Sequence, residues 1–154
     1  MQKKEIRELI KTKVCKMKPA DRDTASLYVC LQVIGTQRWQ EAETVLLYEA
    51  LPDEVDLTLL RQDAEGSGKQ VIMPQPSADA PAIAPEVLQK VDLAIIPGRA
   101  FTAQGDRLGR GKGYYDRLLS SLHCPKWGVA FSCQIVKELP TDPWDVKLDK
   151  IIDQ

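Results

Sequence analysis

The sequence lacks the features that mark secreted, membrane-spanning and metal-clustered proteins. None of its apolar runs approaches the roughly 20 residues that a membrane-spanning helix needs. Its first residues mix lysine with glutamate and contain no apolar segment, so we expect neither a secretory signal nor a transit peptide. The four cysteines stand far apart without a Cys-x-x-Cys pair, which favours reduced thiols over a disulfide framework or a zinc site. These absences predict a cytosolic protein.

An excess of charge of one sign is lacking as well. The 21 lysines and arginines face 22 aspartates and glutamates, so no overall field draws the chain to nucleic acid or to a membrane surface. No aromatic platform accompanies the basic residues, which also argues against a nucleic-acid binder. The 154 residues suit one domain, 1–154, with a hydrophobic core, and we expect a monomer. We expect His123, the only histidine, on the surface, and Trp39 and Trp127 in the packed interior.

Short apolar runs and helical segments follow one another along the chain. Apolar residues on one helical face predict an amphipathic helix over 2–17, and dense apolar residues predict a largely buried helix from Asp21 or Asp23 to Gly35. Further helices are predicted over 52–60, opened by Pro52, and over 114–122. Strands are predicted over 44–48, 71–73, 93–96, 128–131 and 151–152. Because these strands lack polar–apolar alternation, we predict an α/β fold with a mostly parallel sheet covered on both faces.

The proline-rich segment 74–85 contains four of the ten prolines and is predicted to be a loop, the one candidate for a flexible cover.

A glycine-rich segment follows the predicted strand 93–96 and precedes the predicted helix 114–122. Four of the nine glycines lie here, at Gly105, Gly109, Gly111 and Gly113. Glycines let backbone N–H groups converge on an anion, and a helix N-terminus adds partial positive charge. Three cations are interleaved with them: Arg107, Arg110 and Lys112. The spacing fits neither common phosphate-loop motif, and a surface turn that needs glycine for its shape is the alternative, but the cations favour a phosphate cradle.

Asp116 stands one turn into the helix, beside the expected anion. A Mg²⁺ ion shared between this carboxylate and phosphates would explain an acidic residue at that place.

The segment also resembles a known family. The run 92–98, Ala100-Phe101, Gly105 and the string R-L-G-R-G-K-G-Y-Y-D over 107–116 are similar to those of 5-formyltetrahydrofolate cyclo-ligases, also called methenyltetrahydrofolate synthetases. The resemblance implies a three-layer α/β/α fold, akin to sugar-phosphate isomerases and CoA transferases. It implies that MgATP and 5-formyltetrahydrofolate give 5,10-methenyltetrahydrofolate, ADP and phosphate. ATP would phosphorylate the formyl oxygen before N10 closes the ring.

The resemblance also implies roles for individual residues. The nucleotide would be held by Lys3, Arg7, Arg107, Gly109, Arg110, Gly111, Lys112, Gly113, Tyr114 and Asp116, of which Arg107 and Lys112 would be catalytic. Asp116 and Asp145 would hold Mg²⁺. Glu54 would grip the folate near its formyl group, with Tyr115 as an aromatic neighbour.

Several of these residues have simpler alternative interpretations. Lys3 and Arg7 could lie on a solvated helix face, Asp145 could be a turn residue, and Glu54 a first-turn charge. Tyr114 and Tyr115 would point about 100° apart on a helix, so one is expected in the core.

The sequence departs from the family pattern between Pro74 and Asp92, where it is shorter and where a wall of the folate site is expected. Leu57, Gln75 and Arg99 replace a threonine, a basic residue and an apolar residue. Three hypotheses follow: an active cyclo-ligase with a trimmed folate wall, an ATP-dependent enzyme acting on another small substrate, or a non-catalytic nucleotide- or folate-binding relative. The retained cations and carboxylates argue against the last.

Overall fold

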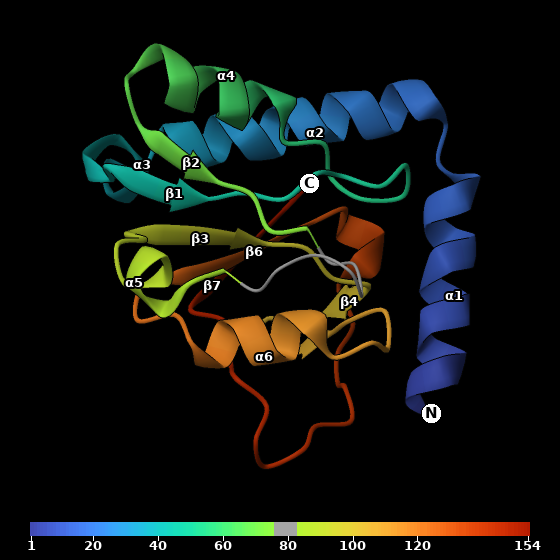
Figure 1. Cartoon of the computed structure of the whole chain (residues 1–154). Coiled ribbons are helices and arrows are strands. Elements are labelled where there is room, and N and C mark those ends of the chain that lie inside the picture. The colour runs from blue at the N-terminus through green and yellow to red at the C-terminus, as the bar shows by residue number, and fades with distance from the viewer. Residues whose placement is uncertain (76–82) are drawn as a thin grey trace.

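A five-stranded parallel sheet forms the centre of the computed structural model, which describes residues 1–75 and 83–154 (Figure 1). The strands are β1 (Thr44–Leu46), β2 (Gln70–Ile72), β3 (Leu93–Ile96), β6 (Lys126–Ala130) and β7 (Lys150–Asp153). Their order is β2-β1-β3-β6-β7, and every neighbouring pair is parallel. In register, Val45 pairs with Val71 on one side and with Leu93 on the other. The predicted parallel sheet is therefore confirmed.

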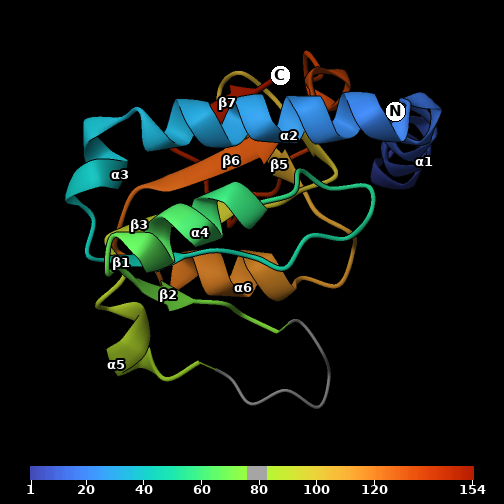
Figure 2. The same ribbon diagram turned by 90° about the horizontal axis from the view of Figure 1, so that it is seen from above.

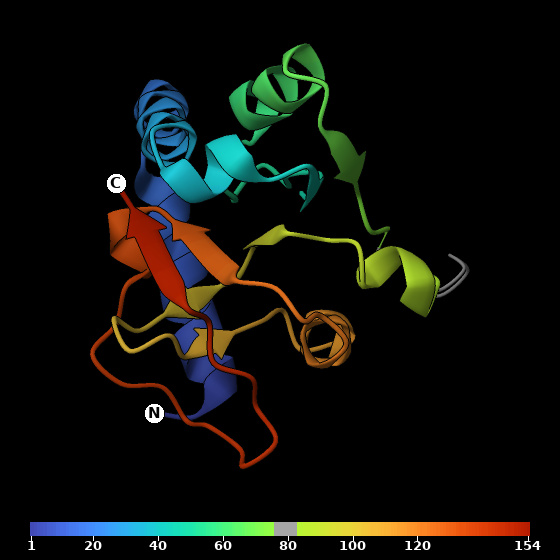
Figure 3. The same ribbon diagram turned by 90° about the vertical axis from the view of Figure 1, so that its left-hand side faces the viewer.

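Helices cover both faces of this sheet and make three layers (Figures 1 and 3). One face carries α2 (Pro19–Ile34), α3 (Gln37–Glu41) and α4 (Thr58–Gly66), and the other carries α5 (Pro85–Leu88) and α6 (Tyr114–Ser120). Successive strand residues point to opposite faces: Val45 and Leu47 join the core under α2, whereas Leu46 joins the core under α6. Because both faces are buried, the strands show no polar–apolar alternation in sequence.

Helix α1 (Lys3–Lys16) stands apart from the layers, at the side of the sheet toward which β1, β2 and β3 point (Figures 1 and 2). It packs against the hairpin strand β4 (Ala100–Phe101) and the short 3₁₀ helix η1 (Ser132–Gln134). Strand β4 pairs antiparallel with β5 (Arg107–Leu108), a hairpin that the sequence analysis did not anticipate. Gly105 turns this hairpin at φ 96°, and a Cβ there would lie 2.3 Å from the Leu148 carbonyl oxygen. Only glycine fits at that position.

The prediction that the second helix is largely buried is wrong. Its side chains Leu27, Tyr28 and Leu31 are each more than half exposed. The opposite side of α2, with Val29 and Val33, is fully buried and is sufficient to cover the sheet. The helix also begins at Pro19 rather than near Asp21, because proline fits the first turn of a helix.

The prediction of a helix opened by Pro52 is also wrong. Residues 52–57 form a loop, and α4 begins only at Thr58, whose backbone N–H donates to the Asp56 carboxylate (2.9 Å). The Tyr48 hydroxyl donates to the Val55 carbonyl oxygen (2.7 Å) and holds this loop beside the end of β1.

Smaller differences concern the ends of elements. Helix α6 ends at Ser120, two residues before the predicted end, and α3 was not predicted. Most of the predicted flexible cover, residues 76–82, lies outside the described residues, and Pro85 begins α5. Trp39 and Trp127 are buried and His123 is exposed, as expected. Among the described helices, none combines the length and the apolar character needed to cross a membrane.

The order of the strands fixes where a ligand can bind. From β1 the chain passes through α4 to β2, and from β3 it passes through α6, on the opposite face, to β6. The connections thus diverge between β1 and β3, and open α/β sheets bind their ligands at the carboxyl ends of strands at such a point.

Candidate active site

A cavity of about 1090 Å³ opens at the carboxyl ends of β1 and β3. Tyr48 and Glu49, which follow β1, line it together with Pro97 and Gly98, which follow β3. Met73 contributes from the end of β2. All the residues that the sequence analysis singled out for the site line the same cavity: Lys3, Arg7, Glu54, Arg107, Gly109, Arg110, Gly111, Lys112, Gly113, Tyr114, Tyr115, Asp116 and Asp145. The structure brings them together, while their individual roles stay predictions.

The glycine-rich loop owes its shape to two left-handed glycines. Gly111 has φ 102° and Gly113 has φ 70°, and the exposed Lys112 lies between them. Arg7 of α1 supports the loop from outside: its Nε donates to the Gly109 carbonyl oxygen at 2.8 Å. A Cβ on Gly111 would lie 3.5 Å from the Arg7 guanidinium carbon. Helix α1 therefore packs its basic side chain directly on the loop.

Arg107 is the buried cation of the site. Its Nε donates to the Pro97 carbonyl oxygen (2.6 Å), its Nη1 lies 3.6 Å from the Asp116 carboxylate, and its side chain is only 6% exposed. The guanidinium stands over the Tyr115 ring, 5.2 Å from the ring centre. Burial lowers the pKa of Arg107, and the charge of Asp116 opposes that shift. Arg107 thus joins the end of β3 to the start of α6 within the lining of the cavity.

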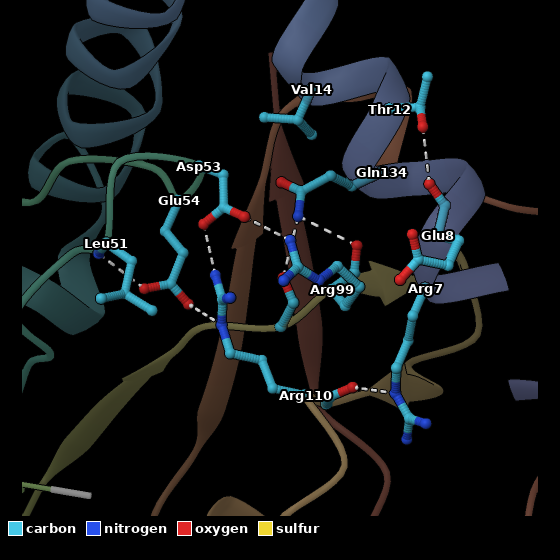
Figure 4. A network of polar contacts seen from close by, with 12 residues as sticks. Arg7, Glu8, Thr12, Val14, Leu51, Asp53, Glu54, Arg99, Arg110 and Gln134 are labelled. Atoms are coloured by element: carbon cyan, nitrogen blue, oxygen red, sulfur yellow. Dashed lines mark hydrogen bonds and ion pairs between the residues drawn. The ribbon is translucent and has the colours of Figure 1, made fainter. Parts of the chain in front are cut away.

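The other side of the cavity holds a network of ion pairs (Figure 4). Asp53 binds Arg99 through one carboxylate oxygen and Arg110 through the other. Arg110 also reaches Glu54, with its Nε 3.5 Å from Oε2. The second oxygen of Glu54 accepts the Leu51 backbone N–H at 2.9 Å. Arg110, predicted as a contact of the nucleotide, therefore has its guanidinium between two carboxylates in this structure.

The pKa values of these two carboxylates are shifted in opposite directions. Burial raises the pKa of Glu54, although the Leu51 N–H and Arg110 pull it down. Burial also acts to raise the pKa of Asp53, but hydrogen bonds from Arg99 and Arg110 outweigh it and hold the pKa below the ordinary value. Asp53 is therefore ionised throughout the neutral range. The ionised form of Glu54 is less stable than that of Asp53, because burial outweighs its favourable contacts.

Two tyrosines face the cavity from the start of α6. The rings of Tyr114 and Tyr115 meet edge to face with centres 5.3 Å apart, and both are half-buried. Tyr115 packs against both core clusters and still lines the cavity, so the expected division into one core and one site residue is wrong. Burial raises the pKa of both phenols, and both are protonated at neutral pH.

The two predicted metal ligands come from separate segments, Asp116 from α6 and Asp145 from a loop. Asp116 is half exposed on α6, and one oxygen of Asp145 accepts the Asp142 backbone N–H at 2.8 Å. Lys3 pairs with the Asp142 carboxylate at 3.0 Å, which ties α1 to the same loop. Within residues 1–75 and 83–154, no group of three or more acidic, histidine or cysteine side chains could hold a metal alone. Asp116 and Asp145 both line the cavity, and Mg²⁺ commonly takes one or two carboxylates and completes its shell with phosphate oxygens and water. Their role as magnesium ligands stays a prediction.

Comparison with known proteins now decides the family. The model of the 5-formyltetrahydrofolate cyclo-ligase family matches residues 1–85 and 80–154, the whole length of the chain. The chain belongs to this family. The "Probable 5-formyltetrahydrofolate cyclo-ligase" of Caenorhabditis elegans is 28% identical over 188 residues, with 97% of this chain and 91% of the relative covered.

Two solved structures of cyclo-ligase relatives extend the likeness to the fold. A 5,10-methenyltetrahydrofolate synthetase from Mycoplasma pneumoniae has a TM-score of 0.84 and 28% identity, covering 99% of this chain and 98% of the other. A 5,10-methenyltetrahydrofolate synthetase from Aquifex aeolicus has a TM-score of 0.83 and 30% identity, covering 99% and 90%.

The two matched segments of the cyclo-ligase model meet at residues 80–85, inside the stretch between Pro74 and Asp92 where the sequence departs from the family pattern. The Mycoplasma structure nevertheless has nearly the same extent as this chain. A protein described as a methenyltetrahydrofolate synthetase therefore has nearly the same length as this chain.

Proposed function

We propose that this protein converts 5-formyltetrahydrofolate to 5,10-methenyltetrahydrofolate in a reaction that depends on ATP and Mg²⁺ and releases ADP and phosphate. One observation carries the proposal: a single cavity joins a glycine-rich loop with cations, Arg107 and Lys112, to a buried carboxylate, Glu54. Such a cavity can hold a polyphosphate against an organic substrate. The family match over the full chain supports the same reaction.

The nucleotide would lie on the glycine-rich loop. The backbone N–H groups around Gly111 and Gly113 and the ammonium group of Lys112 would hold its phosphates, with Arg7 and Lys3 reaching from α1. Arg107 is fixed by Pro97 and cannot follow a moving ligand, so it would supply a preorganised positive charge to the transferring phosphoryl group. Mg²⁺ held by Asp116 and Asp145 would neutralise charge on the phosphates when bound.

The chemistry requires activation because a formamide oxygen is a poor leaving group. The formyl oxygen would form a bond to the γ-phosphorus while the bond from phosphorus to the oxygen of ADP breaks. N10 would then attack the formyl carbon, lose its proton, and close the five-membered ring as the carbon–oxygen bond to phosphate breaks. The protein would act mainly by positioning the two substrates and by stabilising charge.

Glu54 would sit on the folate side of this reaction. Positive charge develops on the folate nitrogens as the activated formyl group forms and persists in the methenyl product. The Glu54 carboxylate, 8% exposed and paired only loosely with Arg110, would stabilise that charge in a site of low polarity. Tyr115, beside Arg107, would provide an aromatic surface for the pterin ring.

The two other hypotheses from the sequence are not favoured. The Caenorhabditis relative and the two solved structures, each of which matches nearly the whole chain, carry the cyclo-ligase or synthetase name. The cytosolic location and the monomeric state stay predictions.

Turnover can be measured directly from the near-ultraviolet absorbance of the methenyl product. We expect absorbance to rise with MgATP and 5-formyltetrahydrofolate together, and not when ATP is omitted or when Mg²⁺ is chelated. Lys147→Met offers a matched control, because Lys147 forms an ion pair with Asp106 (3.5 Å) but does not line the cavity. This variant should turn over like the unchanged protein. An absence of product from the folded, unchanged protein would overturn the proposed function.

A further inference from the structure

Arg99 is a charged residue outside the set that the sequence analysis assigned to the site. It lies between β3 and β4, and its side chain is only 11% exposed. Figure 4 shows its guanidinium directed at Asp53, which in turn faces Arg110. A buried arginine of this kind needs a compensating interaction, and Asp53 supplies it.

Four charged side chains from three separate segments form one continuous chain of contacts. Arg99 binds Oδ2 of Asp53, and Arg110 binds Oδ1, each at 2.5 Å. Arg110 then bridges to Glu54, whose other oxygen is held by the Leu51 N–H. Each carboxylate oxygen of Glu54 therefore has one partner, the Leu51 N–H at 2.9 Å and Arg110 at 3.5 Å.

The backbone of Arg99 is anchored independently of its side chain. Its N–H donates to the Leu108 carbonyl oxygen (2.7 Å), and its carbonyl oxygen accepts from Nε2 of the buried Gln134 (3.1 Å). Gln134 is fixed at its other end, where its Oε1 accepts the Phe131 N–H (2.8 Å). The backbone of Arg99 is therefore held by two hydrogen bonds at one end of the network, and Arg110, in the middle of the network, lies on the glycine-rich loop.

Charge balance explains what Arg99 adds. Arg110 alone would face the two carboxylates of Asp53 and Glu54, leaving one negative charge in excess. With Arg99 the quartet is neutral, and Asp53 shares its charge between two guanidiniums. Arg110 is then free to extend one nitrogen toward Glu54 instead of collapsing fully onto Asp53.

We propose that Arg99 is a positioning residue of the substrate site, which acts through Asp53 and Arg110 to hold the Glu54 carboxylate in place. This inference rests on the proposed function, because that function places Glu54 against the folate. It also assigns Arg110 to the folate side of the cavity, although the sequence analysis assigned it to the nucleotide.

Three variants test the inference: Arg99→Met, Arg99→Lys and Asp53→Asn, with Lys147→Met as the control outside the cavity. We expect Arg99→Met to raise KM for 5-formyltetrahydrofolate about tenfold and to change KM for MgATP by less than about twofold, because only the folate contact loses its alignment. Arg99→Lys keeps a cation beside Asp53 and should recover most of this loss. In the Asp53→Asn background, Arg99→Met should add less than about twofold, because the path through Asp53 is already cut.

The assay separates failure of the inference from failure of the proposed function. No product from the unchanged protein would overturn the function, and this inference with it. Normal turnover by the unchanged protein, with Arg99→Met raising both KM values equally or neither, would overturn the inference alone. If Arg99→Met fails to fold, Asp53→Asn carries the test, because it removes the link between Arg99 and Arg110. The inference is wrong if Asp53→Asn raises both KM values equally or neither.

Discussion

The glycine-rich side and the Glu54 side of the cavity differ in how their charges are assembled. On the glycine-rich side, Arg107, Lys112 and Asp116 stand within ten residues of one another, and the loop between them is shaped by left-handed glycines. On the other side, Arg99, Asp53 and Arg110 meet from segments far apart in the sequence. The first side is a local motif, and the second exists only because parallel strands bring their loops to one edge.

The first prediction concerns removal of a cation from the glycine-rich side of the cavity. Lys112→Ala should lower kcat/KM by a factor of about 10² to 10³, because it removes a cation that the proposed function places against the phosphates. The side chain is exposed, so the free energy of unfolding should change by less than about 0.5 kcal/mol. Steady-state kinetics with varied MgATP and a thermal unfolding curve measure the two effects. A large loss of stability with unchanged nucleotide affinity would count against the phosphate cradle.

These two sides also mark how far sequence reasoning reaches. The parallel sheet and the glycine-rich loop were predicted, because apolar runs and contiguous glycines carry their signal locally. Arg99 was noticed only as a departure from the family pattern, and Asp53 was passed over beside Glu54. No short sequence pattern indicates that residues 53, 99 and 110 are neighbours, because their contact depends on the order of the strands.

The sequence also failed to predict how much of α2 is buried. Its apolar density predicted burial, but Leu27 and Leu31 are more than half exposed. Density of apolar residues does not say how many faces of a helix are covered, because coverage depends on the layer in which the helix lies.

The second prediction concerns removal of the carboxylate charge from the Glu54 side of the cavity. Glu54→Gln keeps the shape and the Leu51 contact but removes the charge, so kcat/KM for 5-formyltetrahydrofolate should fall by roughly 10- to 100-fold. Affinity for MgATP should stay the same, because Glu54 is not on the glycine-rich loop. Steady-state kinetics with each substrate varied in turn measure the difference. Equal loss for both substrates would mean that the two sides are not separable.

The third prediction sharpens the glycine-rich side. Asp116→Asn should raise the Mg²⁺ concentration for half-maximal turnover about tenfold, because an amide oxygen binds Mg²⁺ more weakly than a carboxylate. The magnesium titration is carried out at saturating ATP and folate. An unchanged titration would remove Asp116 from the metal site and leave only its pairing with Arg107.

The smallest effect concerns stability and pH on the Glu54 side. The folded pKa of Asp53 lies below the ordinary value of 3.8, so its ion pairs stabilise the fold fully above that pH. As pH falls below 3.8, Asp53 binds a proton and this contribution is lost. Asp53→Asn should therefore lower the free energy of unfolding by about 1–2 kcal/mol at pH 7. The difference from the unchanged protein should shrink in acid, and a difference that is constant from pH 7 to pH 3 would contradict the ion-pair assignment.

The central claim is that one cavity has two separable sides, and crossed calorimetric titrations test it most directly. A non-hydrolysable ATP analogue with Mg²⁺ and, separately, 5-formyltetrahydrofolate are titrated into Lys112→Ala, Glu54→Gln and the unchanged protein. The account predicts that Lys112→Ala weakens binding of the analogue alone and that Glu54→Gln weakens binding of the folate alone. Equal weakening of both ligands by either variant, or no weakening by both, would contradict it.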